Sequence, residues 1–154
     1  MTNQCNILQG IALVCHARGS TIIAAGPHHT LGPDSFLWFA IIGAIVFTSI
    51  QTQDLEDMEG DAKRDRKTLP LVFGETVGRF SVAIPVSAWS ILSPLFWRLE
   101  IVGYVPSCVV GFTIAFRVLV WKNIRSDKIT WKLWCLWIIT IYLLPLLKNH
   151  SVFK

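Results

Sequence analysis

Long apolar blocks restrict the fold of this sequence more than any other feature. Five of them approach the roughly 20 residues that a helix needs to cross about 30 Å of hydrocarbon. They cover residues 7–25, 36–52, 80–97, 104–121 and 131–147, and the first is the weakest because Cys15, His16 and Arg18 interrupt it. Charged residues make up 16% of the chain, whereas a soluble domain carries about 25%. We therefore predict an all-α, polytopic membrane helix bundle of about five transmembrane helices, with residues 1–154 as one domain.

The placement of basic residues predicts which side of the membrane each loop faces. The chain has a net charge of +4, and in a membrane protein such an excess marks cytoplasmic loops. With five spans, the N-terminus and the loops at 53–79 and 122–132 share one side, which holds nine Lys and Arg residues against three on the other. We therefore expect an integral, multi-pass protein in the lipid bilayer, with the acidic loop 53–79 on the cytoplasmic side. No stretch of basic and aromatic residues indicates nucleic-acid binding.

An acidic run follows the second apolar block. Five carboxylates fall between residues 54 and 61, and a carboxylate cluster at a membrane face is typical of sites for cations and, through cations, for phosphates. If the helix continues past Thr52, then Asp54, Asp57 and Asp61 lie on one of its faces at spacings of three and four. Aspartates on one face can hold Mg²⁺ and leave its other positions for water or phosphate oxygens. We expect Gly60 to loosen the helix end so that Asp61 turns inward.

The sign of the charge reverses directly after this run. Lys63, Arg64, Arg66 and Lys67 follow within six residues of Asp61. Cations beside a metal–carboxylate site suit a diphosphate, which carries several negative charges. Judged by charge alone, a solvated loop that neutralises itself is the competing interpretation.

These residues closely resemble the second aspartate-rich motif of the UbiA superfamily of membrane prenyltransferases. That motif consists of a polar residue and Asp, then D-x-x-x-D, a basic stretch, T-hydrophobic-P and hydrophobic-Gly. The matching residues here are Gln53-Asp54, Asp57 with Asp61, Arg66-Lys67-Thr68-Leu69-Pro70 and Phe73-Gly74. The match is contiguous over residues 53–74, and it outweighs the solvated-loop interpretation.

The resemblance implies a nine-helix membrane fold around a central cavity, of which the spans of this chain correspond to the last five. In the family, two aspartate-rich motifs bind Mg²⁺ and a polyprenyl diphosphate, whose loss leaves an allylic cation that a lipophilic acceptor attacks. The resemblance therefore implies Asp54, Asp57 and Asp61 as metal ligands. It implies Lys63, Arg66 and Lys67 as diphosphate-binding residues.

The sequence departs from the family in three places, one of which is Gln53, where Asn is commoner. The first aspartate-rich motif, of the type N-x-x-x-D, is absent from the chain, so half of the expected site is missing. We expect the chain alone to hold metal poorly and to be inactive, as a C-terminal half, a truncated gene product or a degenerate paralogue. Asp65 stands where a small residue such as Gly is common, and it adds a negative charge among the basic residues.

Three functions remain open at this stage. The first is Mg²⁺-dependent transfer of a prenyl group to a small lipophilic acceptor. The second is a membrane terpene cyclase of the same family, in which the double bonds of the substrate attack the allylic cation. The form of the motif in residues 53–61 is similar to that of fungal members of secondary metabolism. The third is a non-catalytic membrane paralogue.

Several residues inside the apolar blocks allow either a functional or a packing role. Trp131, Trp134 and Trp137 recur on one side of the last block, where packing is the simpler interpretation and contact with an allylic cation the alternative. Arg117 lies in the fourth block, within one turn of the expected interface, where its side chain can reach the headgroup region. The four cysteines lack metal-binding spacing and are expected to be buried free thiols.

Overall fold

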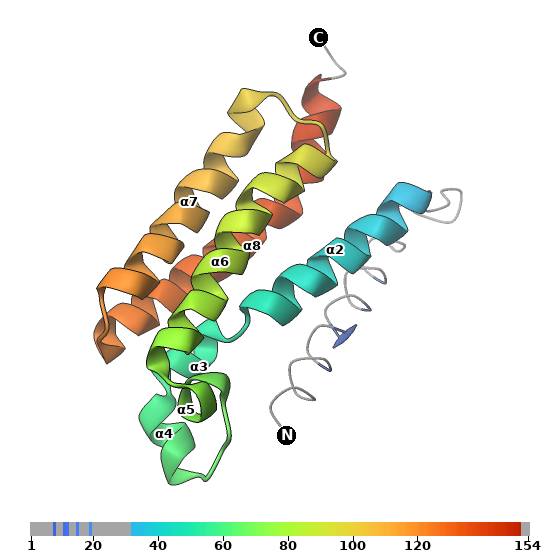
Figure 1. Cartoon of the computed structure of the whole chain (residues 1–154). Helices are drawn as coiled ribbons and strands as arrows, with labels where there is room; N and C mark the ends of the chain where they lie inside the picture. The colour runs from blue at the N-terminus through green and yellow to red at the C-terminus, as the bar shows by residue number, and fades with distance from the viewer. Residues whose placement is uncertain (1–7, 9–10, 13–14, 16–18, 20–31, 152–154) are drawn as a thin grey trace. The chain divides into compact units, whose positions relative to one another are not determined.

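The computed structural model describes residues 32–151, together with residues 8, 11–12, 15 and 19 (Figure 1). The described part is helical, and no strand occurs in it. Its helices are α2 (Pro33–Ser49), α3 (Thr52–Glu56), α4 (Met58–Lys63), α5 (Leu69–Phe73), α6 (Glu75–Phe96), α7 (Ile101–Val120) and α8 (Ile124–Ser151). The predicted all-α fold is confirmed for these residues.

Four of the five predicted spans are present as helices. The candidate spans among the described residues are Pro33–Glu56, Glu75–Phe96, Ile101–Val120 and Ile124–Lys148, each long and apolar enough to cross a bilayer. The predicted span at residues 7–25 lies almost entirely outside the described residues. The largest difference in bounds is at the last span, where α8 begins at Ile124 rather than near Trp131.

The chain divides into two compact units, Met1–Ile50 and Gln51–Lys154. In the first unit, α2 begins with Pro33 at its first position, where the missing N–H costs nothing. Its buried residues recur at spacings of three and four along one face, and they are Trp38, Phe39, Ile42, Ile45, Val46 and Ser49.

The second unit is built on three long helices, α6, α7 and α8, which run side by side (Figure 1). Helix α7 contacts both α6 and α8. The fully buried apolar side chains of this bundle are Val82, Val86, Ile114, Val118, Trp137, Ile141 and Leu144. Three short helices adjoin it, since α3 packs on α8 and α6 and α5 packs on α6. The bundle thus supports the segment that carries the acidic motif.

A polar contact at Ser90 joins the three long helices near their middle. Pro94 has no N–H, so the carbonyl of Ser90 loses its intrahelical donor. Helix α7 replaces that donor, because the Ser107 hydroxyl donates to the Ser90 carbonyl at 3.0 Å and the Cys108 thiol at 3.4 Å. From α8, the Trp137 Nε1–H donates to the Ser90 Oγ at 2.9 Å. Pro94 is therefore accommodated by packing, because the carbonyl that it leaves without an intrahelical donor is satisfied within the protein.

Gly111 allows α7 to approach this contact. A Cβ at residue 111 would overlap the Ser90 Oγ and lie 3.0 Å from the Trp137 Nε1. We predict that Gly111→Ala destabilises the protein by about 1–3 kcal/mol through overpacking. Unfolding in detergent, followed by circular dichroism, measures this. Equal stability of Gly111→Ala and the unmodified chain would contradict the prediction.

A buried ion pair between Arg79 and Asp127 is the second polar contact that joins the three long helices. The Arg79 guanidinium of α6 donates to both oxygens of Asp127 on α8, at 3.0 and 2.8 Å. It also donates to the Val118 carbonyl of α7 at 2.8 Å and to the Glu75 carboxylate at 2.7 Å. Arg79 and Asp127 are 2% and 3% exposed, so this contact is shielded from water. It fixes the end of the bundle on which α3 and α5 pack.

The structure shows the surroundings of the residues whose roles the sequence leaves undecided. Arg117 donates to the Ser126 Oγ at 3.1 Å, and its guanidinium lies 4.6 Å from the centre of the Trp121 ring. Trp134 and Trp137 are buried, which favours the packing interpretation. Cys15, Cys108 and Cys135 are free thiols, but Cys15 and Cys135 are exposed and Cys108 is half-buried, so the expectation of burial is wrong for them.

Candidate metal and diphosphate site

The acidic segment is divided between two short helices. Helix α3 ends at Glu56 and α4 begins at Met58, because Asp57 between them has φ −115° and ψ 22°, outside the helical region. Helix α2 has already ended at Ser49. The expected continuous helix is therefore wrong, and so is the alignment of three aspartates on one of its faces. Their assignment as metal ligands stays a prediction that depends on tertiary structure.

Asp57 and Asp61 are brought together around one cationic group. The Arg64 Nη1 lies 3.3 Å from the Asp57 Oδ2 and 3.8 Å from the Asp61 Oδ1. Arg66 approaches the same Asp61 oxygen at 3.1 Å. Residue 61 is only 2% exposed although it is acidic, so the expected inward turn of Asp61 is confirmed. The interruption that allows it falls at Asp57 rather than at Gly60.

Asp54 belongs to the same electrostatic cluster as Asp61. It is half-buried on α3, and the negative charge of Asp61 and the positive charge of Arg66 both act on it. Among the residues that the structure describes, no group of three His, Cys, Asp or Glu side chains is arranged to hold a metal ion. Asp57 and Asp61 share the Arg64 cation, and Asp54 is coupled to Asp61 through its charge, so all three stay candidate ligands of one site.

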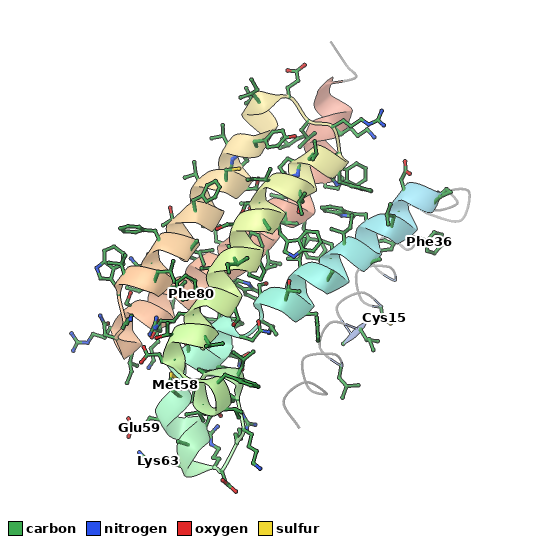
Figure 2. All side chains as sticks on the ribbon, viewed as in Figure 1. Cys15, Phe36, Met58, Glu59, Lys63 and Phe80 are labelled. Carbon is green, nitrogen blue, oxygen red and sulfur yellow. The ribbon has the colours of Figure 1, made fainter. Side chains whose placement is uncertain are left out.

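The predicted diphosphate-binding residues differ in their surroundings. Lys63 donates to the Glu59 carboxylate at 2.7 Å, and both side chains are exposed on α4, away from the long helices (Figure 2). This hydrogen bond lowers the pKa of the Glu59 carboxyl and raises the pKa of Lys63. Arg66 is bound to Asp61, and Lys67 is exposed. Arg66 thus contacts the acidic pair directly.

Sequence reasoning did not single out Arg64. It lies in the basic run, but the motif assigned the diphosphate to Lys63, Arg66 and Lys67. The signal available in the sequence was its spacing, since Arg64 follows Asp61 by three residues and Asp57 by seven, which places all three on one side of a helix.

Gly78 joins the two halves of the motif at the bundle. A Cβ at residue 78 would lie 2.8 Å from the Pro70 Cβ and 3.5 Å from a Leu55 methyl group. Leu55 belongs to the acidic half and Pro70 follows the basic half, so both pack against one turn of α6. The next residue is Arg79, whose hydrogen bonds to Val118 and Asp127 hold that turn against α7 and α8. The position of the motif is therefore set by the bundle and not by its own short helices.

Thr68 carries a buried hydroxyl without a partner. It precedes α5 in the extended conformation of an N-cap, but its side chain makes no capping hydrogen bond. Residue 68 is 2% exposed, and its Oγ1 has no hydrogen-bond partner among the described residues.

Asp65 has an uncommon backbone conformation with φ 52°. Left-handed backbone is costly for residues with a Cβ and is tolerated best by Gly, then by Asn and Asp. We predict that Asp65→Val destabilises the protein by about 1–2 kcal/mol, whereas Asp65→Gly is neutral or stabilising. Thermal unfolding in detergent measures both, and equal stability of Asp65→Val and Asp65→Gly would show that the loop does not hold this conformation.

The comparisons with known proteins agree with this architecture. The sequence profile of the UbiA prenyltransferase family matches residues 1–143. The chain therefore belongs to the UbiA prenyltransferase family, and with its four apolar helices it is an integral membrane protein. No solved structure matches it significantly.

Several curated relatives are similar over most of this chain. Fumagillin beta-trans-bergamotene synthase of Aspergillus fumigatus is 29% identical over 92% of this chain and 48% of its own length. Somaliensene A/B synthase of Streptomyces somaliensis is 29% identical, over 83% of this chain and 44% of its own length. Digeranylgeranylglyceryl phosphate synthase of Natronomonas pharaonis is 30% identical over 81% of this chain and 46% of its own length. The chain thus spans about half the length of these relatives.

Proposed function

We propose that the acidic segment binds Mg²⁺ and the diphosphate of a prenyl substrate, whose loss generates an allylic cation. The observation that carries this proposal is the pair Asp57 and Asp61, which surround one cationic group, Arg64, in a chain of the UbiA family. Two carboxylates that face a common cation in this way repel one another when it is removed. Such a pair suits a divalent cation.

The residues present fit Mg²⁺ in the way that phosphate-handling proteins use it. Mg²⁺ is commonly bound through one or two carboxylates together with phosphate oxygens, and it does not need a cage of protein ligands. Asp57 and Asp61 would supply the carboxylates, with Asp54 as a third that is coupled to Asp61 through its charge. When bound, the ion would neutralise charge that develops on the leaving diphosphate.

The basic residues would then orient the diphosphate. Arg66 already lies at the Asp61 carboxylate, and Lys67 is exposed beside it in the chain. Lys63 is held on the outer side of α4 by Glu59 and would have to leave that carboxylate to join them. Arginine forms two parallel hydrogen bonds to phosphate and so sets its orientation as well as its charge.

Cyclisation of the substrate is the fate of the allylic cation that we favour. The relatives from Aspergillus and Streptomyces are named as terpene synthases, and a third, from Hericium erinaceus, is named as a diterpene cyclase. Transfer to a lipophilic acceptor, which the motif by itself favours, is the second candidate because of the Natronomonas relative. A role in terpenoid secondary metabolism, with the motif on the cytoplasmic side, belongs to the same proposal.

Product analysis tests the proposal and separates its alternatives. Membranes from a host that expresses this chain, alone or with the N-terminal half of the Aspergillus relative, are incubated with a labelled prenyl diphosphate and Mg²⁺. We expect no turnover by the chain alone, and a cyclic hydrocarbon without added acceptor when both halves are present. Recovered diphosphate that is consumed only after an aromatic acceptor is added would identify a transferase. Absence of turnover under every condition would favour the non-catalytic paralogue.

A further inference from the structure

The first turns of α8 carry a cationic face. Arg125, Lys128 and Lys132 are all exposed and are spaced by three and four residues, so they lie on one side of the helix. The opposite side is turned into the protein, since Ser126, Asp127 and Thr130 are buried. Lys122, also exposed, precedes the helix by two residues. We refer to Lys122, Arg125, Lys128 and Lys132 as the α8 cationic face.

This face has no counter-charge in the described part of the protein. Within residues 32–148, none of its four side chains forms an ion pair or hydrogen bond. The acidic residue nearest in sequence, Asp127, is buried, and both of its carboxylate oxygens accept hydrogen bonds from Arg79. In the acidic segment, Lys63, Arg64 and Arg66 are each paired with a carboxylate. The uncompensated positive charge is therefore concentrated on α8.

The same side of α8 becomes apolar within one turn. After Lys132, its exposed residues are Cys135, Leu136, Ile139 and Leu143. One helical turn rises about 5.4 Å, so the change from cation to hydrocarbon is abrupt on the scale of a bilayer. Helix α8 is a candidate span from Ile124 to Lys148, and its cationic turns lie at the end where a span meets the headgroup layer.

The end of α7 also has residues that are typical of the headgroup layer. It ends at Val120, and the following Trp121 is 42% exposed. The Arg117 guanidinium lies against the Trp121 ring and donates to Ser126 of α8. Tryptophan with a basic residue is typical of the membrane–water interface. The exposed α7 residues nearest this end, Phe116 and Val120, are apolar.

We propose that the α8 cationic face binds the headgroup of an anionic phospholipid of the surrounding bilayer, with an acyl chain against Leu136 and Ile139. Arg125 and Lys132 are about 10 Å apart along the helix axis, which matches one or two phosphodiester groups. Basic clusters at the end of a span recognise anionic lipids in this way. The inference does not depend on the proposed prenyl chemistry, because none of these residues belongs to the acidic motif.

Lipid retention on the whole 154-residue chain tests this site. The protein is reconstituted in mixed phosphatidylcholine and phosphatidylglycerol, extracted gently, and its bound lipids are counted by native mass spectrometry. We expect phosphatidylglycerol to be enriched over its share of the bilayer. In the triple variant Arg125→Gln/Lys128→Gln/Lys132→Gln, this enrichment should fall by a factor of at least about ten. The matched control, Arg125→Lys/Lys128→Arg/Lys132→Arg, keeps the charge and should keep the lipid.

Three outcomes would overturn the proposal. They are equal retention of both lipids by the unmodified chain, unchanged enrichment in the Gln triple variant at native helicity, and displacement of the lipid by inorganic phosphate at millimolar concentration. If the triple variant does not fold, the single changes Lys128→Gln and Lys132→Gln, both at exposed side chains, give the same test with smaller losses.

Discussion

Replacing Arg79 with Met is expected to destabilise the protein by about 3–5 kcal/mol. The substitution removes the guanidinium and leaves the Asp127 carboxylate 3% exposed without its cationic partner. A buried, unpaired charge costs far more than the net contribution of the pair that it belonged to. The Val118 carbonyl and Glu75 would also lose their donor. Unfolding in detergent, at a pH where carboxylates are ionised, measures the difference.

The double variant Arg79→Met/Asp127→Leu identifies the cause. Since it removes both charges, it should recover most of the lost stability, as apolar replacements of buried ion pairs often do. Lys63→Met, which removes a fully exposed ion pair with Glu59, should leave stability unchanged. If the double variant is no more stable than Arg79→Met, then packing around the side chain, and not the charge, holds the helices together.

Replacing Asp61 with Asn is expected to weaken Mg²⁺-dependent binding of a prenyl diphosphate by about 100-fold, since one charged contact is worth up to about 3 kcal/mol. The amide keeps the shape of the side chain and can still accept the hydrogen bond from Arg66, so α4 should remain folded. It removes the charge that would hold the cation. Retention of a labelled prenyl diphosphate by the chain together with the N-terminal half of the Aspergillus relative in lipid nanodiscs, with and without Mg²⁺, measures the effect.

Glu56→Gln is the matched control for this change. Glu56 is half-buried between Asp54 and Asp57 and has no assigned role at the site. Its replacement removes one carboxylate from the same segment and should leave binding unaltered. Equal losses in Asp61→Asn and Glu56→Gln would mean that the segment acts by total charge and not through specific ligands.

The sequence predicted the membrane helices well because hydropathy and length decide them locally. The predicted bounds 80–97 lie within five residues of those of α6, and the predicted bounds 104–121 lie within three residues of those of α7. The start of α8 was missed because Arg125, Asp127, Lys128 and Lys132 read as a polar loop. A local signal for the helix start was present, since the Asn123 Oδ1 accepts a hydrogen bond from the Ser126 N–H at 2.8 Å and Asp127 lies in the first turn of α8. The burial of Asp127 depends on Arg79, 48 residues away in sequence, and no local pattern contains that contact.

The acidic site was only partly predictable for the same reason. Residue types and the motif indicated Asp57 and Asp61, which the structure does bring together. The helical break at Asp57 was not foreseen, because local spacing assumes a regular helix. Arg64 was missed because the family motif assigned the diphosphate to Lys63, Arg66 and Lys67. Gly78 and Pro70 show what sets the actual geometry, which is the docking of the segment on α6.

The Ser90 carbonyl also has a consequence for sliding motions. Membrane helices that pack through apolar side chains alone can shift past one another by a turn, about 5.4 Å, with similar contacts before and after. The other interior proline of α6, Pro85, frees the carbonyl of Ser81, which is nine residues from Ser90 and therefore lies on the opposite side of the helix. A shift of α7 by one turn would leave the Ser90 carbonyl in hydrocarbon without a hydrogen-bond donor. Helices α6 and α7 therefore have a single allowed register.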